Sequence, residues 1–175
     1  RVFGAALETT RPGVVVDSFG VGSLNTKTLA KHDPKVFGDM LAARDYDLVV
    51  FLTGANDCFT MDAVPRSFHS ILEVVRARLP GASILLATPP DRGIRRSFPQ
   101  TLSVVAQRRA LAESEGVPLW DQFEAMGGEG SMKQFVQAKL AFGDAVHFSE
   151  LGGAVICDRL VAALLQSFDG YVAAH

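Results

Sequence analysis

Short apolar runs alternate with stretches of helical periodicity along the whole chain. The runs lie at residues 14–16, 48–52, 83–88 and 117–120, each bounded by turn-forming or polar residues. Continuous apolar strands of this length are buried on both faces, as happens when helices cover both sides of a parallel sheet. The pattern therefore predicts an α/β fold with three layers, helix–sheet–helix, in a single domain over residues 1–175.

Helical periodicity fills the intervals between the runs. Residues 26–43 are expected to form a helix broken near Pro34, and residues 64–79, 102–115 and 151–168 to form three more. The carboxyl ends of parallel strands share one edge of a sheet, where open α/β folds place their sites. Polar residues that directly follow the apolar runs are therefore the first candidates for function.

Composition excludes several classes of function. The 175 residues carry a net charge of −2, which provides no basic surface for nucleic acid or an anionic membrane. No apolar run reaches the roughly 20 residues of a transmembrane span. The two cysteines, Cys58 and Cys157, are too few for a disulfide framework, and no Cys/His cluster has zinc-ligand spacing. We therefore expect neither a metal nor a nucleic-acid partner.

Asp144 and His147 form the most informative short pattern. They lie in a segment that begins with a glycine and precedes the last helical stretch, with Ser149 placed to cap that helix. A carboxylate three residues before a histidine can reach the Nδ1–H of the imidazole and leave Nε2 free as a general base. An isolated Asp-x-x-His is usually a surface pair, so this interpretation depends on its context.

Asn56 lies in a tight turn, residues 53–57, directly after the second apolar run. A side-chain amide held at a strand end can donate a hydrogen bond to the oxyanion of a tetrahedral intermediate. Asn is also common in turns for purely conformational reasons, so both interpretations stay open. Asp57 is expected to buttress the turn rather than to act in catalysis.

A Gly-Val-Gly-Ser segment, residues 20–23, follows the first apolar run. It is not a dinucleotide loop, because Asn25 occupies the third glycine position and no acidic residue ends a second strand about 20 residues later. Ser23 could lend its backbone N–H to an oxyanion. A self-contained hydrolase with Ser18 or Ser23 as nucleophile is a weaker alternative, because the Gly-x-Ser-x-Gly elbow is absent.

Taken together, these motifs resemble blocks of the SGNH, or GDSL-type, esterase superfamily. Residues 54–57 resemble its third block, residues 144–147 its fifth and residues 17–23 its second. In the second block, Ser23 occupies the position of a glycine whose N–H serves the family's oxyanion hole. Three further segments are similar to the branch that contains peptidoglycan O-acetylesterases: residues 89–91, 120–121 and 127–132.

The resemblance implies a flavodoxin-like parallel sheet and a serine-hydrolase mechanism without metal or organic cofactor. It implies Asp144 and His147 as the catalytic pair, and Asn56 and Ser23 as oxyanion donors. The family's first block, a Gly-Asp-Ser turn that bears the nucleophile, occurs nowhere in the 175 residues. The strand before that turn is central in such sheets, so we expect an N-terminal segment or a second chain to supply both strand and serine.

We interpret the chain as the C-terminal portion of the catalytic domain of a carbohydrate O-acyl esterase, with O-acetyl groups on a polysaccharide as the expected substrate. Family analogy favours a periplasmic or extracellular location. The alternative is a non-catalytic glycan-binding or scaffolding domain that kept the fold and lost the serine. A co-purifying polypeptide with a Gly-Asp-Ser turn would favour the enzyme.

Overall fold

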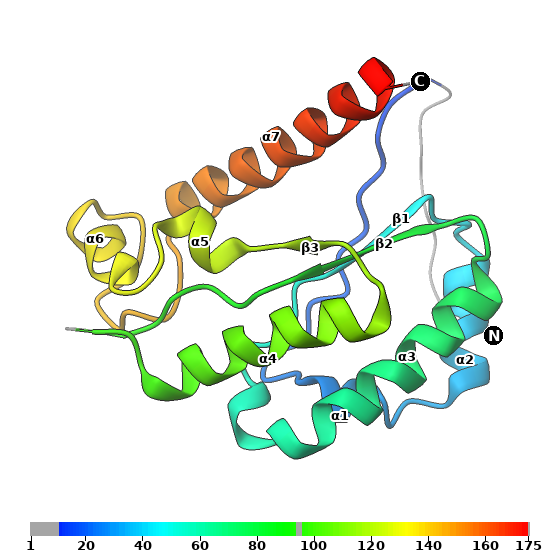
Figure 1. Cartoon of the computed structure of the whole chain (residues 1–175), viewed down its shortest axis with the longest axis horizontal. Coiled ribbons are helices and arrows are strands. Elements are labelled where there is room, and N and C mark those ends of the chain that lie inside the picture. Colours follow the sequence, from blue (N-terminus) through cyan, green and yellow to red (C-terminus); the bar gives the residue numbers. More distant parts are fainter. Residues whose placement is uncertain (1–10, 94–95, 175) are drawn as a thin grey trace.

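A parallel sheet forms the middle layer of the protein. The computed structural model describes residues 11–93 and 96–174. The sheet has three strands in the order β1-β2-β3, and Val49 of the first lies opposite Ile84 of the second. Figure 1 shows them side by side through the centre of the molecule. The strands are β1 (Leu48–Phe51), β2 (Ser83–Ala87) and β3 (Leu119–Trp120).

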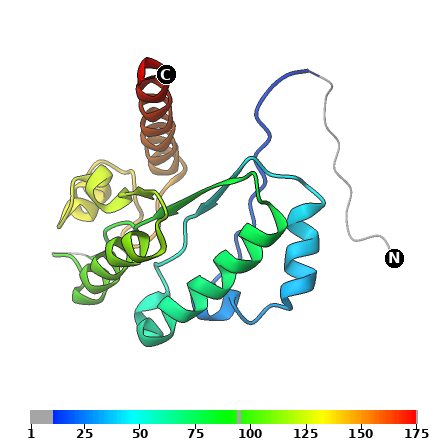
Figure 2. The same cartoon turned by 45° about the vertical axis from the view of Figure 1, so that its right-hand side comes forward.

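Helices cover both faces of this sheet. α1 to α4 lie on one side, and α5 to α7 lie on the other (Figures 1 and 2). The expected break near Pro34 separates α1 from α2. The helices are α1 (Thr26–Leu29), α2 (Pro34–Ala42), α3 (Val64–Arg78), α4 (Pro99–Glu115), α5 (Gln122–Met126), α6 (Ser131–Gln137) and α7 (Glu150–Ala174), with two single-turn 3-10 helices, η1 (Asp57–Phe59) and η2 (Met61–Ala63).

Side chains of the strands alternate between two hydrophobic cores, one on each face of the sheet. Phe51 and Leu86 contribute to the core under α2, α3 and α4, whereas Leu85 and Ala87 contribute to the core under α5, α6 and α7. Successive residues of a strand point to opposite faces, so both faces must be covered when every residue is apolar. The three-layer α/β arrangement predicted from the apolar runs is therefore confirmed.

Short polar residues and glycines set the helix ends. Asp33 caps α2 by accepting a 2.9 Å hydrogen bond from a backbone amide in the first turn, where Pro34 also lies. Gly116 ends α4 in the left-handed conformation, with a φ of 63°. Ser149 lies before α7 as predicted, and its hydroxyl accepts a 3.2 Å hydrogen bond from the Gly152 amide.

Asp121, the N-cap of α5, connects α4 to the ends of two strands. Arg109 of α4 donates from Nε to one oxygen of this carboxylate over 2.7 Å. Thr88, directly after β2, donates its hydroxyl to the other oxygen over 2.9 Å. Because Asp121 itself directly follows β3, one carboxylate fixes the carboxyl ends of β2 and β3 relative to α4.

The first apolar run does not form the strand that the sequence predicts. Residues 11–22 form no helix or strand, and Val14, Val15 and Val16 are 91%, 57% and 83% exposed. A strand needs a neighbouring edge that accepts its backbone hydrogen bonds. This segment pairs with no strand among the described residues, so the prediction of a strand here is wrong for the chain as it stands.

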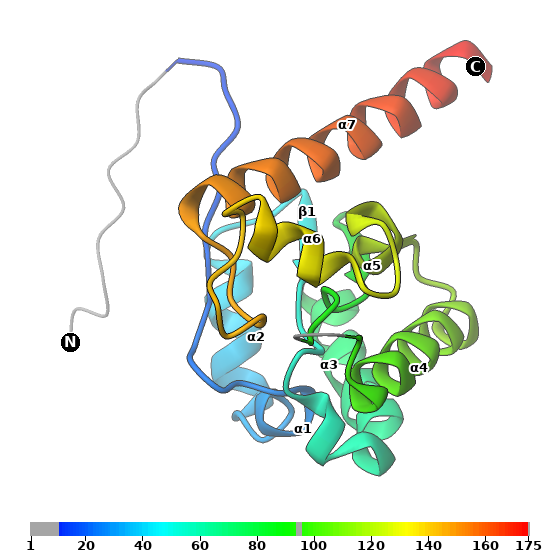
Figure 3. The same ribbon diagram turned by 90° about the vertical axis from the view of Figure 1, so that its left-hand side faces the viewer.

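Residues 11–22 run down the β1 side of the molecule toward α1 (Figure 3). Asp17 fixes the segment there, because its carboxylate accepts hydrogen bonds from Arg44 Nε at 2.8 Å and from the Tyr46 hydroxyl at 2.6 Å. The hydrogen bond from Tyr46, followed by that from Arg44, lowers the pKa of Asp17. Within the described part of the chain, β1 pairs with β2 only, so its other edge is open.

α7 is the longest described helix and is exposed along most of its length. Only Gly152 and Ile156 are buried in it, and the helix contacts α5. Among the described helices it alone is long and apolar enough to cross a membrane, by length and composition only, and the apolar runs of the sequence did not predict this. Its exposed apolar side chains are Leu151, Val161, Leu164, Leu165, Phe168, Tyr171 and Val172.

Candidate active site

The structure brings the carboxylate of Asp144 and the imidazole of His147 into contact. Asp144 Oδ2 lies 2.8 Å from His147 Nδ1. Its other oxygen, Oδ1, accepts hydrogen bonds from the backbone amides of Val146 at 2.9 Å and His147 at 3.1 Å. A carboxylate only accepts hydrogen bonds, so Nδ1 carries the proton, and in the neutral imidazole the lone pair is on Nε2. The arrangement has the geometry of a general base with its orienting carboxylate.

Hydrogen bonds to both carboxylate oxygens keep Asp144 ionised. The bond from the His147 ring, together with the two backbone amides, lowers its pKa from 3.8 to about 2. The His147 side chain is 74% exposed, so the ring is accessible to a substrate. In the described ranges no serine hydroxyl forms a hydrogen bond with this ring, and neither Ser18 nor Ser23 is paired with it.

The loop that carries this pair is held at both ends. Phe142 N donates to His147 O over 2.9 Å, and an isolated β-bridge joins Ala141 to Phe148. Ala145, at the bend between them, is buried and adopts a φ of 54°. Its carbonyl accepts a 3.0 Å hydrogen bond from Gly93 N, which ties the loop to the chain that follows β2.

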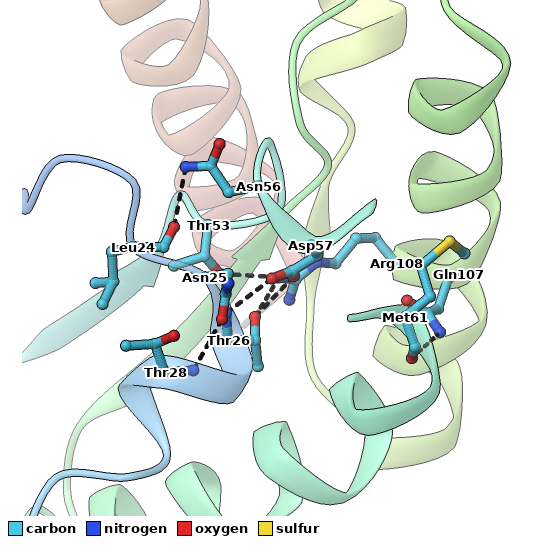
Figure 4. A network of polar contacts seen from close by, with 10 residues as sticks. All are labelled: Leu24, Asn25, Thr26, Thr28, Thr53, Asn56, Asp57, Met61, Gln107 and Arg108. Atoms are coloured by element: carbon cyan, nitrogen blue, oxygen red, sulfur yellow. Dashed lines mark hydrogen bonds and ion pairs between the residues drawn. The ribbon is translucent and has the colours of Figure 1, made fainter. Parts of the chain in front are cut away.

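Asn56 and Ser23 belong to two turns that contact each other. Asn56 Nδ2 donates to Leu24 O over 3.2 Å, as Figure 4 shows. Ser23 adopts a φ of 62°, a left-handed conformation that is unusual for a residue other than glycine. Its backbone N–H donates to no described residue, and neither does the second hydrogen of the Asn56 amide. Both predicted oxyanion donors are therefore available at neighbouring positions.

A buried network below these turns was only partly foreseen. Asp57 was expected to buttress its turn, and it does: it accepts hydrogen bonds from Thr26 N at 2.7 Å and from Thr26 Oγ1 at 2.8 Å. Arg108, whose guanidinium pairs with Asp57 (Figure 4), was not among the residues predicted from the sequence. An Arg at one position of a helix gives no signal of burial, and the pairing becomes visible only when α4 is placed against the β1 turn.

The two halves of the site lie at the same edge of the sheet. The turn that carries Asn56 directly follows β1, and the loop that carries His147 is bonded to the segment after β2. In Figures 1 and 3 both lie toward the carboxyl ends of the strands. This agrees with the placement expected for a parallel sheet. No group of three or more metal-ligating side chains gathers anywhere in the described ranges.

The pKa of Asp144 provides a test that needs only this chain. Replacing His147 by alanine is expected to raise that pKa above about 2, toward the ordinary value, because the largest cause of the lowering is lost. The backbone amides of Val146 and residue 147 remain and hold the pKa below its ordinary value. A carbon-13 NMR titration of the carboxyl groups measures the shift.

The same titration has a defined sign and a matched control. A carboxylate whose pKa is lowered in the folded state stabilises the fold at pH values above the pKa that it has in the unfolded chain. For Asp144, that contribution is lost as the pH falls through about 2. Replacing His69 of α3, which lies beside Glu115 of α4, is expected to leave the pKa of Asp144 unchanged. An Asp144 midpoint that is the same with and without His147 would contradict the assigned contact.

Solved structures share this fold. A peptidoglycan O-acetylesterase is 24% identical, with a TM-score of 0.72, and the match covers 87% of this chain but 45% of that protein. An acetyl xylan esterase is 18% identical, with a TM-score of 0.62 and coverage of 82% and 78%. A carbohydrate esterase of family 3 from Talaromyces cellulolyticus is 16% identical, with a TM-score of 0.62 and coverage of 85% and 70%.

The chain thus spans less than half the length of the peptidoglycan O-acetylesterase. At these identities the likeness shows the fold, and no curated protein is a significant sequence match. The sequence itself matches the GDSL-like lipase/acylhydrolase family over residues 1–155, which is most of the chain. That match agrees with the resemblance carried by the Asn-Asp turn and the Asp-x-x-His loop. The chain therefore belongs to the GDSL-like lipase/acylhydrolase family.

Proposed function

We propose that the chain provides the general base and the oxyanion site of a carbohydrate O-acyl esterase, with O-acetyl groups as substrate. The observation that carries this proposal is the 2.8 Å contact between Asp144 and His147 in a member of an acylhydrolase family. The structurally similar proteins named as a peptidoglycan O-acetylesterase and an acetyl xylan esterase support a glycan substrate. Such a substrate also favours a periplasmic or extracellular location.

In this mechanism His147 transfers protons while a serine forms and breaks bonds. Nε2 of His147 takes the proton of the serine hydroxyl as its oxygen attacks the ester carbonyl carbon. The oxyanion that forms accepts hydrogen bonds from Asn56 Nδ2 and the Ser23 amide. The intermediate collapses, and the sugar alcohol leaves with the proton from His147. Water then hydrolyses the acyl-serine by the same steps, which releases acetate and restores the enzyme.

The attacking serine belongs to a segment outside this sequence. The 175 residues contain no Gly-Asp-Ser turn, and β1 has an open edge within the described part of the chain. An open strand edge presents unpaired N–H and C=O groups that can bind another strand. A parallel strand added to this edge ends at the carboxyl edge of the sheet, so a turn after it lies beside Asn56 and His147.

The connection rule for parallel strands predicts where a helix after that strand packs. β1, β2 and β3 are joined through α3 and α4, which lie on one face of the sheet. If residues 14–16 pair with the added strand as the next parallel strand, a right-handed connection in the opposite direction places its helix on the other face. That face carries α7, whose apolar side chains are exposed. One strand–turn–helix segment therefore covers both open surfaces.

The experiment is to add such a segment and measure acetate release. A strand–Gly-Asp-Ser–helix segment with the pattern of the family's first block is joined ahead of residue 11, giving what we call the extended enzyme. We expect it to release acetate from O-acetylated glycan and from p-nitrophenyl acetate, and to unfold at a higher temperature than the chain alone. The matched control replaces the serine of the added turn by alanine, which keeps the stability gain and removes the activity.

Three outcomes would count against the proposal. A stabilised but inactive extended enzyme that binds O-acetylated glycan favours the non-catalytic glycan-binding or scaffolding domain. An isolated chain that is labelled by a fluorophosphonate at Ser18 or Ser23 favours a self-contained hydrolase. A segment that fails to raise the unfolding temperature refutes the open edge of β1 as its binding site.

A further inference from the structure

Arg108 is a buried cation on α4. Its side chain is 0% exposed, and so is that of its partner Asp57. One nitrogen, Nη2, contacts the Asp57 carboxylate, donates to Thr26 Oγ1 over 2.7 Å and donates to Thr53 Oγ1 over 3.0 Å. Burial lowers the pKa of Arg108, and the charge of Asp57 opposes that effect. The contacts of this nitrogen therefore join α4 to the ends of both site turns.

The residues that Arg108 joins directly adjoin the two oxyanion donors. Asp57 follows Asn56, and Thr26 begins α1 three positions after Ser23. Below the site, Asp57 bonds to both the amide and the hydroxyl of Thr26, while above it Asn56 bonds to Leu24 (Figure 4). Hydrogen bonds therefore join the two turns at two places. The Arg108 guanidinium lies against one of them, the contact between Asp57 and Thr26.

We propose that Arg108 is the positioning residue that, through Asp57 and Thr26, holds Asn56 and Ser23 in register as a pair of oxyanion donors. This inference rests on the proposed function, since the donors have a role only if an oxyanion forms between them. Hydrogen-bond donors stabilise a transition state when their positions are fixed before the charge develops. A buried ion pair with hydroxyl partners fixes two turns more firmly than a surface contact would.

Gly54 supports the same inference. Its φ is 125°, which is unfavourable for residues with a side chain, and a Cβ built there would lie 3.2 Å from Arg108 Nε. The backbone of the Asn56 turn therefore lies directly against the guanidinium.

The test uses Arg108→Lys, which keeps the positive charge on a side chain one bond shorter. In the 175-residue chain, NMR signals of the Asn56 side-chain amide and of the Ser23 and Leu24 backbone amides are expected to move. The Asn56 signal is assigned by its loss in Asn56→Asp. In the extended enzyme, kcat is expected to fall about 10- to 100-fold while KM changes by less than about twofold, since misplaced transition-state contacts lower kcat.

Two control variants separate positioning from general loss of stability. Leu72→Ala opens a cavity in the core under α3 and is expected to lower stability without moving these three signals. Arg109→Lys changes the adjacent residue, which pairs with Asp121 and Glu124, and is also expected to leave them in place. Unmoved signals in Arg108→Lys, or equal movement in Leu72→Ala, overturn the proposal.

A second variant decides the question if Arg108→Lys does not fold. Thr26→Val removes the hydroxyl between Asp57 and Arg108 at nearly constant volume, and the same three signals are expected to move. Because the spectra are recorded on the chain alone, they decide the positioning role even if the extended enzyme is inactive and the proposed function fails. An active extended enzyme whose kcat is unchanged by Arg108→Lys refutes the positioning role alone.

Discussion

Replacing His147 by alanine is expected to abolish the activity of the extended enzyme. Without the imidazole, no group accepts the proton of the attacking serine or returns it to the leaving alcohol. Loss of the base in a serine-hydrolase site lowers kcat by at least about a thousandfold, so the residual rate is expected to fall close to that of the serine-to-alanine control. The measurement is steady-state release of acetate or p-nitrophenol at pH 7 to 8.

The fold is expected to survive this substitution, because the His147 side chain is 74% exposed. Unfolding temperature and circular dichroism verify that. The matched control is His32→Ala, since His32 is an exposed histidine between α1 and α2 whose ring contacts Leu29 O at the end of α1. Activity in His147→Ala comparable to that in His32→Ala would show that another group is the base.

The second large effect concerns stability. Replacing Arg108 by methionine leaves the Asp57 carboxylate buried without its cation, which is expected to cost about 3–5 kcal/mol. Replacing Asp57 by asparagine in the same chain removes the second charge and keeps an acceptor for Thr26 N. The double variant is therefore expected to be more stable than the sum of the two single changes predicts, with a coupling of about 1–3 kcal/mol.

Urea unfolding of the four proteins in this cycle measures the coupling. Lys35→Ala is the matched control, because the Lys35–Asp39 pair is exposed and screened by solvent and is expected to contribute little to stability. Arg108→Met could instead prove no more harmful than Lys35→Ala. That result would mean that the buried pair is not an important support of the fold.

The sequence predicts the sheet well because apolar runs and helix caps act locally. β2 and α3 lie within one residue of their predicted bounds, and the break before Pro34 follows from proline at a helix start. The strand at Val14 was predicted on the same local grounds and is wrong. Whether an apolar run becomes a strand depends on a neighbouring edge, which no local pattern reports.

The candidate site also has one part that the sequence predicts and one part that it does not. Asp144 and His147 are three residues apart, so their contact follows from chain geometry, and spacing predicts it. Arg108 lies 51 residues from Asp57, and its burial arises only when α4 packs over the β1 turn. α5 and α6 were missed because both are too short to show a periodic pattern, and a glycine adjoins one end of each.

Arg108 and Arg109 are consecutive residues of α4, yet they hold opposite outer strands of the sheet. Arg108 pairs with Asp57 after β1, and Arg109 pairs with Asp121 after β3. A slide or rotation of α4 would displace both turns at once, so the spacing of the strand tips and the geometry of the oxyanion donors are mechanically coupled. Substitutions on the buried side of α4 would thereby alter the spacing between the turns that follow β1 and β3.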